Sequence, residues 1–135
     1  MILQQRQNGP RRRAAFTLME VLVVVAILVI LASVSSIFVF RYLDDAKDGA
    51  AKSSIATLTQ ACQAYKLKYQ EYPPNLQQLV QPPNGSPFVE PDALLDPWQR
   101  QFQYDPNGPR NNGLKPDIST TGSHGQEIGN WSGSQ

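Results

Sequence analysis

A single carboxylate stands one turn inside a segment that is apolar and long enough to cross a membrane. Glu20 precedes an uncharged run from Val21 to Phe40, which amounts to roughly 20 residues or about 30 Å of helix. A charge near the core of a bilayer costs at least ~2.5 kcal/mol, so an acid in this place indicates a function. A cut between Ala15 and Phe16 would create an α-amino group four residues before Glu20. The spacing therefore allows an ion pair between a carboxylate and a chain terminus.

The apolar run has the features of a membrane anchor that the mature protein keeps. It exceeds the about 7–15 residues of a secretory signal, and no small-x-small cleavage site ends it, because Ile37-Phe38-Val39-Phe40 leads into Arg41-Tyr42. The first 15 residues hold four arginines and no acid, and such positive charge stays in the cytoplasm. We expect a single-pass membrane protein with a cytoplasmic N-terminus.

Composition argues against several classes of function. Four of the 12 basic residues lie in the first 15 positions, and the remainder carries more acids than bases, so nothing indicates a nucleic-acid-binding surface. Cys62 is the only cysteine, which rules out an intramolecular disulfide, and we expect it to be a small buried helix residue. The single histidine and the lack of a Ser/His/Asp spacing that suits catalysis predict a protein that is not an enzyme.

One long helix is predicted from about Phe16 to Gln70, because no proline occurs between Phe16 and Pro73 and Gly49 is the only glycine in that stretch. Its length would be on the order of 80 Å. So small a chain cannot bury such a helix, so its exposed half must contact lipid or other copies. The predicted parts of the chain are a basic leader (1–15), an apolar transmembrane or assembly helix (16–40), an amphipathic helix (41–71) and a region of loops and short strands (72–135).

The remaining pattern predicts an α+β fold, in which the long N-terminal helix carries a small antiparallel sheet. We expect a short helix over 76–80 capped by Asn75, and strands around 102–104 and 114–120, with Pro116 indicating an edge strand. Residues 122–131 are predicted to be mostly loop. Residues expected to pack in the core are Leu43, Ala46, Ala50, Ile55, Leu58, Cys62, Tyr65, Tyr69, Trp98, Ile128 and Trp131.

The residues around Glu20 resemble a known leader junction. Arg11-Arg12-Arg13-Ala14-Ala15-Phe16-Thr17-Leu18-Met19-Glu20 is similar to type IV pilins and the pseudopilins of type II secretion, in which a basic leader is cleaved before a phenylalanine and a glutamate is the fifth mature residue. Four later segments occur in the same order as in the major pseudopilin family. They are Tyr72-Pro73, Leu76 to Val80, Leu95-Asp96-Pro97-Trp98, and Asp117-Ile118-Ser119 with Ile128-Gly129-Asn130-Trp131.

This resemblance implies a pilin-like fold and a structural role. A prepilin peptidase would cut between Ala15 and Phe16 and methylate the new amine of Phe16. Glu20 would pair with that amine on a neighbouring subunit, although a solvated position at the lipid headgroups is the other interpretation. The homopolymer would form a periplasmic filament that helps to export folded proteins, together with minor pseudopilins and an inner-membrane platform. A surface type IV pilin and a solitary signal-anchored binding domain are the alternatives.

Three departures from the family have consequences. Ala15 stands where glycine is usual, which predicts slower cleavage. Val29 and Ile37 stand where many relatives have glycine and proline, which predicts a more continuous helix in the filament. The C-terminal loop of relatives holds calcium, and the positions that correspond are Leu114, Asp117 and Glu127. Calcium remains an open expectation, because the loop is shorter. In addition, His124, a poor ligand for a hard cation, replaces an aspartate.

Overall fold

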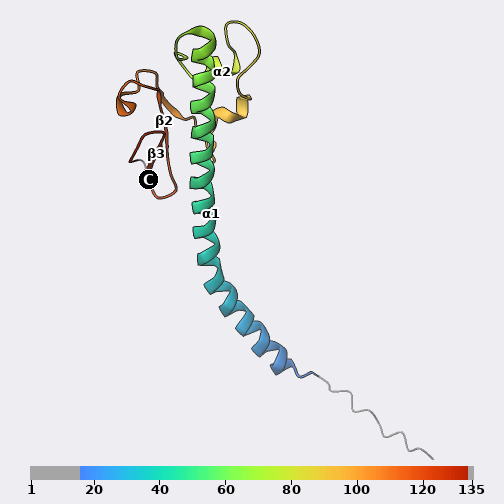
Figure 1. Cartoon of the computed structure of the whole chain (residues 1–135). Coiled ribbons are helices and arrows are strands. Elements are labelled where there is room, and N and C mark those ends of the chain that lie inside the picture. The colour runs from blue at the N-terminus through green and yellow to red at the C-terminus, as the bar shows by residue number, and fades with distance from the viewer. Residues whose placement is uncertain (1–15, 134–135) are drawn as a thin grey trace, which may run out of the picture. The chain divides into compact units, whose positions relative to one another are not determined.

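The computed structural model describes residues 16–133, and its longest element is the helix α1, Leu18–Tyr69 (Figure 1). This helix has 52 residues and agrees with the predicted helix to within two residues at each end. It passes through Val29 and Ile37 without a break. Packing divides the chain into two compact units, of which the second begins at Val39.

The first unit presents an entirely exposed apolar surface. Every described side chain from Phe16 to Phe38 is exposed. The most apolar 18-residue window of α1 has a mean hydropathy of 3.0, so this helix is long and apolar enough to cross a membrane. Ser33 and Ser35 each donate a hydroxyl hydrogen bond of 2.8 Å to the carbonyl four residues earlier. The helix thus satisfies these polar groups itself, as a lipid environment requires.

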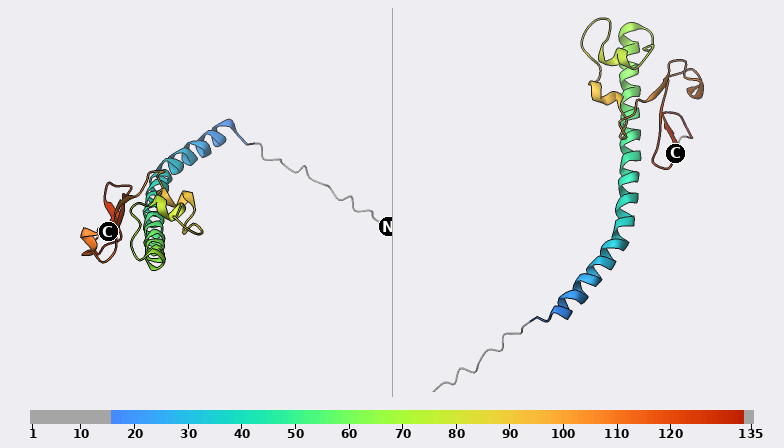
Figure 2. Two further views of the ribbon diagram at one scale, coloured as in Figure 1. Left: turned by 90° about the horizontal axis from the view of Figure 1, so that it is seen from above. Right: turned by 180° about the vertical axis from the view of Figure 1, so that it is seen from behind.

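The second unit packs a three-stranded antiparallel sheet against one face of α1. The strands are β1 (Gln103–Asp105), β2 (Asp117–Thr121) and β3 (Glu127–Gly129), and β2 is central. Both views in Figure 2 place this C-terminal region beside α1. Ile118 and Ile128 join the sheet to the helix, since both are buried in the core cluster. The other buried members are Ala51, Ile55, Leu58, Ala61, Cys62, Tyr65, Leu76, Leu79 and Phe102.

Two expectations about the strands were wrong. Strand β3 lies within the segment that was predicted to be mostly loop. The prediction missed it because the strand has only three residues and lies in a glycine-rich sequence. The second strand begins at Asp117 and not at Leu114, and it is the central strand and not an edge strand. Pro116 directly precedes β2, so a residue without an amide hydrogen stands just outside the ladder.

The predicted core is confirmed at Ile55, Leu58, Cys62, Tyr65 and Ile128 and is wrong at its beginning. Leu43, Ala46 and Ala50 are exposed, because the C-terminal region contacts this part of α1 through Asp44 and Asp48 and leaves those three side chains uncovered. Cys62 is fully buried, as expected. Burial raises the pKa of its thiol to about 12, which keeps it protonated and unreactive.

The two tryptophans differ from the expectation that both are core residues. Trp98 is half-buried and packs against the core cluster. Trp131 is half-buried and does not belong to that cluster. Its position at the end of the sheet, beyond β3, leaves part of the indole at the surface.

Three short helical turns complete the fold. Helix α2 is Gln77–Val80, one residue shorter than predicted, and Leu76 rather than Asn75 stands at its N-cap. The side chain of Asn75 nevertheless accepts a hydrogen bond of 3.2 Å from the amide of Gln78 in the first turn. Two 3-10 turns, η1 (Pro91–Leu94) and η2 (Pro109–Asn111), were not predicted. The turn η2 lies between β1 and β2 and carries part of the site described below.

Candidate functional site

Glu20 forms a reciprocal cap with Thr17 at the start of α1. The amide of Glu20 donates to Thr17 Oγ1 at 3.2 Å, and the amide of Thr17 donates to Glu20 Oε2 at 3.4 Å. This is a capping box, which satisfies two of the amides that a helix N-terminus leaves unpaired. Sequence reasoning concentrated on Glu20 and missed Thr17, although the Thr-x-x-Glu spacing carries the signal.

The cap leaves Glu20 able to bind a second donor. A carboxylate has about four acceptor positions, and the cap uses one oxygen. Both Glu20 and Phe16 are exposed, so both are open to a second molecule. Ala15 lies outside the described residues, so the geometry of the predicted cut is not part of the structure.

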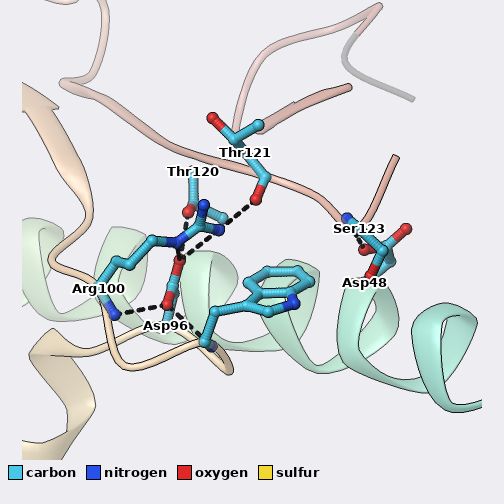
Figure 3. Close-up of polar contacts among 7 residues, drawn as sticks. Asp48, Asp96, Arg100, Thr120, Thr121 and Ser123 are labelled. Atoms are coloured by element: carbon cyan, nitrogen blue, oxygen red, sulfur yellow. Dashed lines mark hydrogen bonds and ion pairs between the residues drawn. The ribbon is translucent and has the colours of Figure 1, made fainter. Parts of the chain in front are cut away.

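A buried carboxylate organises the turn that follows η1. Asp96 is 2% exposed, and its Oδ1 accepts the amides of Trp98 at 2.9 Å and Arg100 at 2.8 Å. Its Oδ2 accepts Arg100 Nε at 3.0 Å and Thr120 Oγ1 at 2.5 Å (Figure 3). Burial opposes ionisation of Asp96, but these hydrogen bonds outweigh it and hold its pKa below the usual value. Arg100 also donates to the carbonyl of Thr121, which attaches the turn to β2.

Asp48 fastens the β2–β3 turn to α1. Its Oδ1 accepts the amide of Ser123 at 2.9 Å (Figure 3). Its Oδ2 accepts Gln126 Nε2 at 2.5 Å. His124, in the same turn, is exposed. Asp48 therefore has an intramolecular role, in which both of its carboxylate oxygens hold this turn.

Asn130 is the polar centre between the helix and the sheet. Its Nδ2 donates to Thr59 Oγ1 at 3.1 Å and to the carbonyl of Pro116 at 2.8 Å. Its Oδ1 accepts the amide of Ile118 at 3.2 Å and the side-chain amide of Asn111 at 2.9 Å. One amide side chain thus connects α1, β2 and η2. Its place in the Ile-Gly-Asn-Trp motif was visible in the sequence, but this role was not.

Replacing Asn130 by alanine is expected to destabilise the second unit by about 2–3 kcal/mol, because several partners would lose a hydrogen bond in a partly buried site. Thermal unfolding of the mature protein in detergent, followed by circular dichroism, measures the effect. Asn84→Ala is the control, since Asn84 is exposed and forms hydrogen bonds through its backbone carbonyl and amide, which the substitution retains. Equal stability of the two variants would contradict this role.

The three residues expected to hold calcium do not converge on an open cation site. The carbonyl of Leu114 accepts the hydroxyl of Tyr72 at 2.9 Å. Asp117 is buried and accepts the amide of Arg110 at 2.9 Å and Asn111 Nδ2 at 2.7 Å. Glu127 forms an ion pair with the guanidinium of Arg110. No group of three or more His, Cys, Asp or Glu side chains suited to a metal occurs among residues 16–133. The donors present therefore do not fit calcium, which requires about six to eight oxygens.

Comparison with known proteins agrees with this architecture. The family described as "Type II secretion system (T2SS), protein G" matches residues 38–134, and the "Prokaryotic N-terminal methylation motif" matches residues 10–36. The chain belongs to the protein G family of type II secretion systems. The resemblance stated from the sequence is thereby confirmed.

Curated members of the protein G family align along nearly the whole chain. "Type II secretion system core protein G" of Pseudomonas aeruginosa is 34% identical over 140 residues, which cover 90% of this chain and 96% of that protein. The proteins of the same name from Vibrio cholerae and Aeromonas hydrophila are 34% and 35% identical, again over 90% of this chain. No solved structure matches the chain.

The two family matches cover different parts of the candidate site. The methylation motif covers the predicted cut, the capping box and most of the exposed apolar helix. The protein G match covers the hydrogen-bond networks of Asp48, Asp96 and Asn130. The described residues of the first set, from Phe16 onward, are exposed and open to partners, whereas the second set holds the domain together.

Proposed function

We propose that this protein G family member polymerises into the periplasmic pseudopilus of a type II secretion system and helps folded proteins to cross the outer membrane. The observation that carries the proposal is the apolar surface of α1 from Leu18 to Phe38, which is exposed along its whole length. A solitary domain in water would not keep such a surface, because burying it is strongly favourable. Lipid covers it before assembly, and neighbouring copies cover it in the filament.

Glu20 and Phe16 set the contact between neighbouring subunits in this proposal. The carboxylate of Glu20 pairs with the methylated amine of Phe16 on the next copy, and each charge offsets the burial of the other. The capping box supports this role, because it holds the carboxylate at the first turn of α1 and leaves acceptor capacity for the amine. No residue of the chain is assigned to catalysis, and an ATPase elsewhere in the system would supply the work.

The protein would reside in the inner membrane with a cytoplasmic N-terminus and a periplasmic C-terminal domain. The arginines before α1 support this orientation. Its partners would be further copies of itself, a prepilin peptidase, minor pseudopilins and the inner-membrane platform. The family match favours this function over a surface pilin or a solitary anchored domain.

Processing is tested by the intact mass of the protein after co-expression with a prepilin peptidase. We expect a chain that begins at Phe16 and carries one added methyl group. Ala15→Gly is expected to be cleaved faster, because glycine is the usual residue before the cut in the family. An intact leader, with the peptidase shown to be active on a control substrate, would contradict the processing step.

A further inference from the structure

A guanidinium group lies at the centre of the C-terminal loops. Arg110 belongs to η2, and its Nη1 donates to Glu127 Oε2 at the start of β3. The amide of the same residue donates to Asp117 Oδ2 at 2.9 Å, at the start of β2. The guanidinium carbon lies 4.4 Å from the ring centroid of Trp131, beyond the end of β3. We refer to Arg110, Asp117, Glu127 and Trp131 as the loop clasp.

Both acids of the loop clasp already accept hydrogen bonds from other groups of the protein. Asp117 is 7% exposed, and its Oδ1 accepts Asn111 Nδ2 at 2.7 Å while its Oδ2 accepts the Arg110 amide. Glu127 accepts the Arg110 guanidinium. A metal ion at these carboxylates would compete with Arg110 and Asn111 for the carboxylate oxygens, and a cation beside Arg110 would also meet its positive charge.

An arginine side chain can supply the positive charge that a bound metal ion would supply beside these carboxylates. Its guanidinium is always charged, is planar, and can bind a carboxylate and stack on an aromatic ring simultaneously. Trp131 provides the ring, and its position is tightly defined, because a Cβ at Gly129 would lie 2.3 Å from the indole. The covalent attachment of Arg110 to η2 also fixes this charge without any dependence on ion concentration.

We propose that Arg110 is the resident cation of the loop clasp, so that the C-terminal domain of this chain holds its loops without calcium. The carboxylates expected to bind calcium, Asp117 and Glu127, instead anchor η2 through the amide and the guanidinium of Arg110. The inference concerns the isolated subunit and does not depend on its assembly into a filament.

The test is the thermal unfolding of the mature protein in detergent, with excess EGTA and with millimolar calcium chloride. The natural chain is expected to have the same Tm in both solutions. Arg110→Gln is expected to lower the Tm by roughly 5 °C in EGTA, as the loss of about 1 kcal/mol does in a small domain. Because Arg110 and Glu127 are each about half exposed (51% and 44%), most of this loss would come from the contact with Trp131.

Two further variants separate the loop clasp from a general effect of charge. Lys115→Gln removes the same charge from the same loop and is expected to leave the Tm within about 1 °C of the natural value. Arg110→Lys keeps the charge but loses the planar stacking, and an intermediate Tm would support the loop clasp. A calcium-dependent rise in the Tm of the natural chain would overturn the proposal. A Tm of Arg110→Gln equal to that of Lys115→Gln would overturn it equally.

Discussion

Replacing Glu20 by alanine is expected to leave processed monomers in the membrane and to lower filament formation by at least about a hundredfold. Loss of one partner of a buried ion pair costs about 3–5 kcal/mol, because the remaining charge stays buried without its counter-ion, and about 1.4 kcal/mol is a factor of ten. The remaining charge in this variant is the methylated amine of Phe16. Cross-linking of membrane fractions measures the filament, and the export of a cargo protein measures its function.

The control for this prediction separates the intersubunit pair from the helix cap. Thr17→Val removes the hydroxyl that accepts from the Glu20 amide but retains the carboxylate. It is expected to loosen the first turn of α1 by about 1 kcal/mol and to reduce assembly far less than Glu20→Ala. If both variants assembled equally poorly, the contribution of Glu20 would lie in the cap, and the pairing with Phe16 would be refuted.

The long helix was predictable because its signals are local. Between Phe16 and Pro73 the chain offers no helix breaker except Gly49, and the observed ends of α1 lie within two residues of the predicted ones. Strand β3 could not be found in this way. Its three residues form a strand only because Ile128 pairs opposite Thr120 and enters the core, and both conditions depend on contacts distant in the sequence.

The same distinction applies to the site. Glu20 was conspicuous because its charge contradicts its apolar surroundings, and Thr17 could have been found from the capping-box spacing. Arg110 had no comparable signal. It lies in an exposed polar turn, and its role depends on the arrival of Glu127 and Trp131 from the end of the chain. The resemblance to calcium-binding relatives pointed to the acids Asp117 and Glu127 and gave no indication of a role for Arg110.

The turn at Asp96 depends both on a local sequence signal and on a contact with a residue distant in the sequence. The sequence Asp96-Pro97-Trp98 indicated a turn, but the hydrogen bond from Thr120 in β2 makes the carboxylate part of the core. Four donors surround an anion whose side chain is fully buried. Removal of a buried carboxylate with this many partners strongly destabilises the fold, because the donors then lack an acceptor.

Replacing Asp96 by asparagine is expected to destabilise the C-terminal domain by about 3 kcal/mol, because the amide group turns a donor toward Arg100 or Thr120. The pKa of Asp96 is lower in the folded chain than its ordinary value of 3.8. Its contribution to stability is therefore complete above that value and is lost as the pH falls through the folded pKa. Urea unfolding of the mature protein measures both effects when it is repeated from about pH 7, where Asp96 is ionised, to about pH 2, where an ordinary aspartate is protonated.

The matched control is Asp92→Asn in η1, because Asp92 is exposed four residues before Asp96. It is expected to change the free energy of unfolding by less than about 0.5 kcal/mol and to keep the acid-induced loss of stability. Asp96→Asn should instead have a shallower dependence on pH below about 4, since one carboxylate with a lowered pKa is gone. Parallel pH profiles for Asp96→Asn and the natural chain would show that the ionised form of Asp96 does not stabilise the fold. The turn would then be held by the backbone around Pro97 and by the packing of Trp98.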